Sequence, residues 1–286
     1  MLLNHDDLVA KKINWNDKVS NLRELASELN LGLDSIVFVD DSSFEIGLIQ
    51  KELPQIMCIQ VPQNLSEYPD CIRKIGLEFF SRSTTAEDAR KTELYQSEKL
   101  RKQNSGGFAS IDEYLASLDL KINIVWDSKI TIARAAQLTQ KTNQFNLTTK
   151  RYTEADISRM LGDSLYSIVT FSVEDRYGDY GITGLMILHV NSKIPATCAI
   201  DSFMMSCRII GRKIEFCFFD RIIMELKKKG IKYLQAEYLV TSKNSQVAQF
   251  YDLLGFNLVE DTAGFKKYHL DIYDYQPVNI PYIVIN

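Results

Sequence analysis

The stretch SCRIIGRKIEF at residues 206–216 decides how the C-terminal half of this chain folds. It follows the apolar run IDSFMM at 200–205 and leads into apolar residues at helical spacing: Ile214, Phe218, Ile222 and Leu226. The pattern predicts a strand, a loop containing Gly211 and then a helix. Because the first helical amides lack partners and the helix dipole attracts negative charge, the loop is a predicted anion site. Arg208 and Arg212 strengthen it.

A second block, KNSQVAQFYDLLGF at 243–256, places Asn244 before a short helix and Tyr251 on it. Gly255 is the expected helix end. Together the two blocks resemble the GNAT superfamily of N-acetyltransferases, in which Arg or Gln, two residues, Gly, one residue and a small residue bind the pyrophosphate of coenzyme A. Arg208 and Gly211 match that motif.

The resemblance implies that coenzyme A, or the phosphopantetheine arm of a carrier, is bound by five residues: Arg208, Gly211, Arg212, Lys213 and Asn244. It also implies that Tyr251 is a general acid for the leaving thiolate. Lys213 stands where the superfamily has a second small residue. A carrier-bound phosphopantetheine, with one phosphate instead of two, fits that change more easily than coenzyme A does.

The composition of the whole chain limits the possible functions. Its 286 residues are 45% hydrophobic and 24% charged, which is ordinary for globular proteins and long enough for two domains. We expect no membrane association and a cytoplasmic location, because no apolar run reaches membrane-spanning length and no signal peptide is visible. A net charge of −4 gives no support for nucleic acid binding. The five cysteines form no CxxC pair, so reduced thiols are expected rather than disulfides or a zinc site.

The first sixty residues show the pattern of an α/β domain. Apolar residues at helical spacing from 16 to 31 precede the buried-strand run SIVFVDD at 35–41, the helical SFEIGLIQKEL at 43–53 and the strand IMCIQVP at 56–62. This order predicts a parallel sheet. A charged helix is expected at 86–103.

The remaining chain has a different order of elements. A strand at KINIVWD, 121–127, is followed by two helices and by strands at 166–173, 182–190 and 195–205. After the anion loop and its helix come a strand at 233–240, a helix at 244–254 and a final strand pair. Two helices after the first strand and a meander before the loop form the acyltransferase arrangement, which agrees with the motif.

Two motifs in the N-terminal part resemble haloacid-dehalogenase-type phosphatases: INWNDK at 13–18 and VFVDD at 37–41. In that superfamily a lysine, here Lys18, stabilises the phosphoryl group, and an acidic pair, here Asp40 and Asp41, holds Mg²⁺. The nucleophilic DxDx[TV] motif is absent from the sequence, so we expect no phosphatase activity from this chain, and Mg²⁺ only if the partial site is completed. Alternatively, Lys18 is a surface residue and the acidic pair caps a helix.

With QLTQKTNQFNLTTKRY at 137–152 and EDRYGDYGITG at 174–184, the chain resembles the FkbH-like family. The resemblance implies loading of a glyceryl group from 1,3-bisphosphoglycerate onto an acyl carrier protein. It gives a partial haloacid-dehalogenase-like Rossmannoid domain at 1–62, a helical connection at 63–118, a GNAT-like mixed α/β acyltransferase domain at 119–275 and a C-terminal tail at 276–286.

Cys207 is the candidate acyl carrier within the chain. The cations beside it and the following helix N-terminus favour a thiolate, although a cysteine on an apolar strand can also be a small buried residue. The amides of Asn143, Gln144 and Asn146 are candidates for binding acyl hydroxyls, or else cap a helix. Asp175 and Arg176 are candidate substrate ligands or part of a hairpin turn.

Carrier-dependent acyl transfer is therefore the expected function. Two alternatives remain open: acetylation of an amine with acetyl coenzyme A, and a non-catalytic subunit that binds the carrier.

Overall fold

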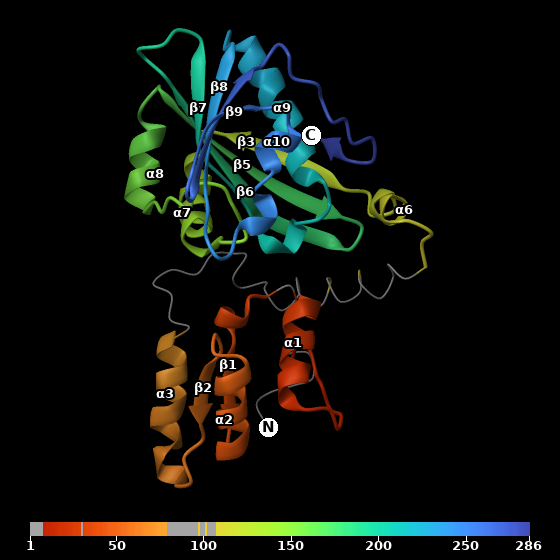
Figure 1. Ribbon diagram of the computed structural model, residues 1–286, viewed down its shortest axis with the longest axis vertical. Helices are drawn as coiled ribbons and strands as arrows, with labels where there is room; N and C mark the ends of the chain where they lie inside the picture. The colour runs from red at the N-terminus through yellow and green to blue at the C-terminus, as the bar shows by residue number, and fades with distance from the viewer. Residues whose placement is uncertain (1–7, 30, 79–96, 98–100, 102–106) are drawn as a thin grey trace. The chain divides into compact units, whose positions relative to one another are not determined.

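The computed structural model describes residues 8–29, 31–78, 97, 101 and 107–286. The chain forms two compact units, Met1–Asn104 and Ser105–Asn286, which are described separately (Figure 1). The charged helix expected at 86–103 falls almost entirely outside the described residues.

The N-terminal unit is built on a small parallel sheet. Its helices and strands are α1 (Lys18–Leu29), β1 (Val37–Asp40), α2 (Ser43–Glu52), β2 (Met57–Gln60) and α3 (Tyr68–Glu78), with short 3₁₀ turns at Leu33–Ser35 and Leu65–Glu67. Strand β1 pairs with β2 in parallel. Helix α2 begins where the Ser42 hydroxyl accepts the N–H of Glu45, a normal N-cap. The expected strand, helix and parallel strand are confirmed.

The C-terminal unit contains the expected order of elements. These are α6 (Ile111–Ala116), β3 (Lys121–Trp126), α7 (Ile132–Lys141), β4 (Phe145–Asn146), α8 (Glu154–Leu161), β5 (Tyr166–Asp175), β6 (Gly178–Val190), β7 (Thr197–Met205), α9 (Ile214–Lys228), β8 (Tyr233–Leu239), α10 (Phe250–Leu253), β9 (Asn257–Thr262), β10 (Phe265–Asp271) and β11 (Val284–Ile285). The sheet order is β11-β3-β5-β6-β7-β8-β10-β9, and β4 also pairs with β7. The predicted mixed α/β arrangement is confirmed.

Helices cover both faces of this sheet (Figure 1). On one face, α9 inserts Phe218, Phe219 and Ile222 among sheet residues such as Phe171 and Phe203. The helices α7 and α8 cover the other face with residues that include Ala135, Leu138 and Ile157. Helix α8 begins in a capping box formed by Thr153 and Asp156. These packed layers fix the ends of β7 and β8, where the candidate site lies.

The segment expected as a C-terminal tail, 276–286, contains a short strand. Val284 and Ile285 pair in parallel with Lys121 and Ile122, so the end of the chain adds a strand beside β3. A two-residue strand carries too little pattern to be recognised in the sequence. Among the described residues, no helix is both long and apolar enough to cross a membrane.

Candidate acyl transfer site

The parallel strands β7 and β8 separate along their length. They pair only between Thr197–Ala199 and Tyr233–Gln235, although β7 continues to Met205 and β8 to Leu239. The second halves of the two strands are therefore not hydrogen-bonded to each other. A group placed between them would meet backbone donors and acceptors from both sides.

The segment Phe145–Leu147 bridges part of this separation. Its first two residues pair antiparallel with Met204–Met205 at the end of β7. The N–H of Leu147 donates to the carbonyl of Phe203 at 3.1 Å, and its carbonyl accepts the N–H of Leu239 at 2.8 Å. The chain itself thus occupies the edge of β7 over its last residues.

Asn244 holds that segment to β8. Its amide group donates to the carbonyls of Asn146 and Leu239, both at 2.8 Å. Its Oδ1 accepts from the N–H of Thr241 at 2.8 Å and from the hydroxyl of Tyr238 at 3.2 Å. The side chain is fully buried and its donors and acceptors are all used. In this structure the Asn244 amide is a structural link between Asn146 and β8, and its expected contact with a cofactor stays a prediction.

Asn146, an expected substrate ligand, is also engaged within the protein. Its amide nitrogen donates to the carbonyl of Thr142 at 3.1 Å, and its Oδ1 accepts the N–H of Thr149 at 2.9 Å. The side chain is buried. Its amide therefore shapes the loop after α7 through contacts within the protein.

The neighbouring amides are more accessible. Asn143 and Gln144 are half-buried. The Oδ1 of Asn143 accepts from the Arg151 guanidinium at 2.6 Å, and the same guanidinium donates to the carbonyl of Thr142 at 3.0 Å. Asn143 thus retains its amide N–H groups for a ligand, and Gln144 stays a candidate.

The predicted anion loop has a distinct backbone. Residues Cys207–Ile209 form a 3₁₀ turn, and Gly211 and Lys213 follow with φ of +83° and +61°. Such angles suit glycine because it has no Cβ, so Lys213 occupies a conformation that the small residue of the motif would adopt more easily. Lys213 is the N-cap of α9 and its side chain makes no capping hydrogen bond. The start of α9 is therefore not capped by a side chain.

The three cations of the loop have different environments. Arg208 donates through Nε to the Ser206 hydroxyl at 3.2 Å, while its Nη1 is buried and has no hydrogen-bond partner among the described residues. Lys213 pairs with Asp112 at 2.7 Å on the surface. Arg212 is buried. A buried guanidinium donor without an acceptor is costly, so Arg208 is the residue best prepared for an anion.

Cys207 lies directly after β7 and starts the 3₁₀ turn, where it is half-buried. Cys198 and Cys217 are buried instead, and burial raises the pKa of each thiol to about 11. Both are core residues, and the raised pKa keeps both thiols protonated at neutral pH. Among the three cysteines of this unit, Cys207 is the most exposed.

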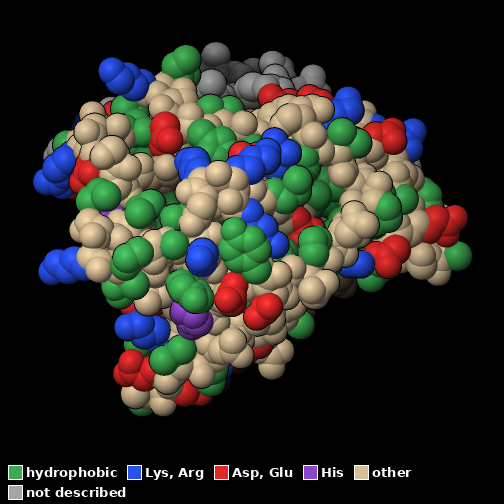
Figure 2. Space-filling model, turned by 90° about the horizontal axis from the view of Figure 1, so that it is seen from above, with side chains coloured by type: hydrophobic (Ala, Val, Ile, Leu, Met, Phe, Trp, Pro, Cys, Tyr) green, Lys and Arg blue, Asp and Glu red, His purple; other side chains and the backbone are tan. Residues whose placement is uncertain are grey.

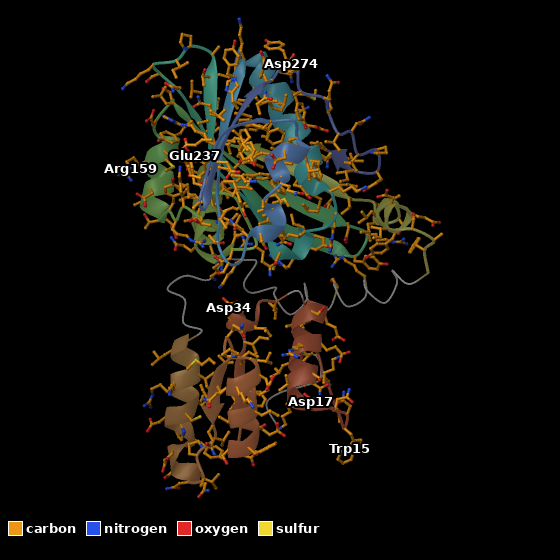
Figure 3. The ribbon with its side chains drawn as sticks, in the orientation of Figure 1. Trp15, Asp17, Asp34, Arg159, Glu237 and Asp274 are labelled. Atoms are coloured by element: carbon orange, nitrogen blue, oxygen red, sulfur yellow. The ribbon has the colours of Figure 1, made fainter. Side chains whose placement is uncertain are left out.

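Tyr251 on α10 is fully buried and its hydroxyl has no hydrogen-bond partner in the described part of the chain. Burial, with a smaller effect of the Glu237 carboxylate on β8 (Figure 3), raises the pKa of this phenol well above its usual value. The neighbouring Tyr268, whose ring centre lies 5.3 Å away, donates to Asp252 at 3.0 Å. Tyr251 is thus protonated at neutral pH, and the same shift makes its hydroxyl a weaker acid than an ordinary phenol.

Asp175 and Arg176, expected to bind substrate or to form a turn, make structural contacts. Asp175 is paired with Arg212, with side-chain exposures of 0% and 8%. Tyr180 donates to Asp175 at 2.7 Å. Arg176 donates to the carbonyl of Ser117 at 3.1 Å. The alternative of a hairpin turn is present, since Asp175 lies opposite Gly178, and the Asp175 carboxylate is enclosed by protein.

A polar cluster that the sequence did not indicate lies at a bulge in β7. Ile200 and Ser202 face consecutive residues of β6, so Asp201 is the extra residue. Its carboxylate accepts from Lys150 at 2.6 Å and from the Tyr152 hydroxyl at 2.8 Å. Burial and the Asp201 carboxylate raise the pKa of Tyr152 above its usual value. Lys150 and Tyr152 follow the NQFNLTT motif, and only the fold brings them to β7.

The partial phosphatase motifs do come together in the N-terminal unit. Lys18 and Asp40 form an ion pair of 2.5 Å, and the N–H of Ser42 donates to Asp40 at 2.9 Å. Burial raises the pKa of Asp40, but the Lys18 ammonium and the Ser42 amide outweigh it, and the pKa falls below its usual range. Asp41 is exposed. Within the described ranges, no group of three or more His, Cys, Asp and Glu could hold a metal ion.

Comparisons with known proteins gave structural neighbours alone. No family model matches the sequence, and no curated protein matches it. The chain is similar to the ribosomal-protein-S18-alanine N-acetyltransferase from Escherichia coli, with 17% identity, 53% of this chain and 94% of that chain covered, and a TM-score of 0.40. The chain is also similar to the spermidine/spermine N-acetyltransferase SpeG from Vibrio cholerae. The identity is 14%, the match covers 55% of this chain and 96% of that chain, and the TM-score is 0.41. A putative acetyltransferase from Salmonella typhimurium with acetyl-CoA has 14% identity, 55% and 97% coverage and a TM-score of 0.39.

Proposed function

We propose that the C-terminal unit is an acyltransferase that loads a small polar acyl group onto the phosphopantetheine thiol of an acyl carrier protein. The observation that carries the proposal is the loop between β7 and α9. It combines an N-terminus of α9 without a side-chain cap with the buried Nη1 of Arg208, which has no partner among the described residues. Both features suit the phosphate of a phosphopantetheine arm.

The proposed chemistry uses two groups, Cys207 in the turn after β7 and Tyr251 on α10. The Cys207 thiolate attacks the carbonyl carbon of an acyl phosphate, the carbon–oxygen bond to phosphate breaks, and phosphate leaves. The carrier thiolate then attacks the resulting thioester, the bond to the Cys207 sulfur breaks, and Tyr251 protonates the leaving sulfur. The donor proposed is 1,3-bisphosphoglycerate. Removal of its second phosphate is not assigned to this chain, because the nucleophilic motif is absent from the sequence.

Intact masses of both proteins test this function. The full chain is incubated with phosphopantetheinylated carrier and 1,3-bisphosphoglycerate and, separately, with acetyl coenzyme A and an amine. We expect an acyl adduct on the carrier, which is lost in Cys207→Ala and kept in Cys71→Ala, another half-buried thiol. Adducts that survive in Cys207→Ala would overturn the cysteine step. Acetylation of the amine without an adduct on the carrier would indicate an N-acetyltransferase. Binding of the carrier to the chain without any adduct would indicate a carrier-binding subunit.

Arg208→Ala is expected to raise the KM for the carrier by about tenfold, since one charge-assisted hydrogen bond contributes about 1.5 kcal/mol. The variant should lose no more than about 1 kcal/mol of stability, because Nη1 has no partner to lose among the described residues and the Nε bond to Ser206 is the one removed. Initial rates over a range of carrier concentrations measure the effect. Arg159→Ala, an exposed arginine on α8 (Figure 3), is the control and should stay within twofold. Equal effects of the two variants would remove Arg208 from the site.

A further inference from the structure

A buried charged cluster connects the β5–β6 hairpin to the anion loop. The Nη1 of Arg212 lies 3.6 Å from the Oδ2 of Asp175, and the Tyr180 hydroxyl donates to that carboxylate at 2.7 Å. Arg212 also donates to the Tyr180 hydroxyl and lies over its ring, 4.8 Å from the ring centre. Three side chains from three segments thus meet in one contact.

The cluster lies in a region from which water is excluded. Tyr180 is 1% exposed, and the side chains of Arg212 and Asp175 are 8% and 0% exposed. Charges so placed are tolerated only as a pair, because removal of one partner leaves the other without compensation. Arg212 and Asp175 therefore hold each other in position. This differs from the surface pair between Lys213 and Asp112, which solvent screens.

The backbone around Arg212 needs such a constraint. Gly211 and Lys213, its two neighbours, both have positive φ, and a lysine keeps that conformation only where its surroundings impose it. A Cβ on Gly211 would meet nothing within 4 Å, so the glycine is needed for its φ and not for space. Arg212 therefore lies between two residues of positive φ, directly before α9, and its side chain is buried.

We propose that Asp175 and Tyr180 are positioning residues for the anion loop. By binding Arg212 they hold Ser206–Lys213 in the conformation that presents Arg208 and the first amides of α9 to a phosphate. They touch neither the phosphate nor the acyl group. The role in transfer rests on the proposed function, whereas the role in holding the loop does not.

The test uses Asp175→Asn, Tyr180→Phe and Arg212→Lys in the full chain. Glu174→Gln is the matched control, because Glu174 precedes Asp175 on β5 and pairs with Lys121 at the surface. Hydrogen–deuterium exchange of the peptide covering 206–216 reads the loop without any substrate. We expect at least tenfold faster exchange in Asp175→Asn, a smaller increase in Arg212→Lys, and no change in Glu174→Gln.

Steady-state transfer gives the second measurement. Asp175→Asn should raise the KM for the phosphopantetheinylated carrier about tenfold and leave kcat within threefold. The double variant Asp175→Asn, Arg212→Gln should raise the KM little further, because the two residues act as a unit. If Asp175→Asn does not fold, Tyr180→Phe, which keeps the ring beneath Arg212, replaces it. Unchanged exchange of 206–216 in a folded variant overturns the positioning role. Faster exchange in a chain whose wild type transfers nothing supports that role and refutes the proposed function.

Discussion

Asn244→Ala is expected to lower the free energy of unfolding of the C-terminal unit by about 3 kcal/mol. The substitution removes both donors and the acceptor of a fully buried amide. The carbonyls of Asn146 and Leu239 and the N–H of Thr241 then lose their partner. Each group left unsatisfied in the interior costs about 1 kcal/mol or more. Urea unfolding followed by tryptophan fluorescence and circular dichroism measures the change.

Two further variants sharpen this result. Asn244→Asp keeps an acceptor for Thr241 but directs an oxygen at two carbonyls, so it should be at least as destabilising as alanine. Asn257→Ala, at an exposed asparagine on β9, should change the stability by less than about 0.5 kcal/mol. If Asn244→Ala keeps the wild-type stability and weakens carrier binding alone, Asn244 is a ligand after all and the structural role is wrong.

The role of the Asn244 side chain could not be predicted from the sequence. Its place before a short helix is visible in the chain, and so is the helix. Its partner Asn146 lies 98 residues earlier, however, and nothing in the local pattern connects the two. An asparagine near a helix end serves equally well as a cap, a turn residue or a ligand. The element was predictable, and the role of the side chain was not.

The same limit applies to the charged residues. Strands and helices around Ser206–Lys213 follow from apolar spacing and Gly211, which are local signals. The hairpin turn that the sequence allowed at Asp175 is present, with Asp175 opposite Gly178. The pairing of Asp175 with Arg212 depends on how this hairpin packs against the loop, and no local pattern indicates it. On the face shown in Figure 2, basic and acidic side chains are intermixed. The sign of a side chain's charge therefore does not distinguish a residue that binds a ligand from one that forms a structural ion pair. The burial of the side chain makes that distinction.

Tyr251→Phe is expected to lower acyl transfer to the carrier at least 100-fold, the contribution typical of a general acid. The same change should raise the free energy of unfolding by about 1 kcal/mol, because it removes a buried hydroxyl that has no partner among the described residues. A lower transfer rate together with a higher free energy of unfolding would show that the Tyr251 hydroxyl serves catalysis and not stability. Single-turnover transfer from acylated Cys207 and urea unfolding measure the two effects.

Tyr268→Phe is the matched control, since both tyrosines are buried and their ring centres lie 5.3 Å apart. Its hydroxyl donates to Asp252, so the phenylalanine variant should lose about 1 kcal/mol of stability and keep transfer within twofold. The two substitutions delete the same atom and are expected to act in opposite directions on stability. If Tyr251→Phe is destabilised like Tyr268→Phe, its hydroxyl has a structural partner. If its transfer rate is unchanged, another group protonates the leaving sulfur. Burial raises the pKa of Tyr251, so this residue keeps its proton at every pH below the ordinary phenol pKa of about 10. Over that pH range, deprotonation of Tyr251 should not lower the rate of transfer.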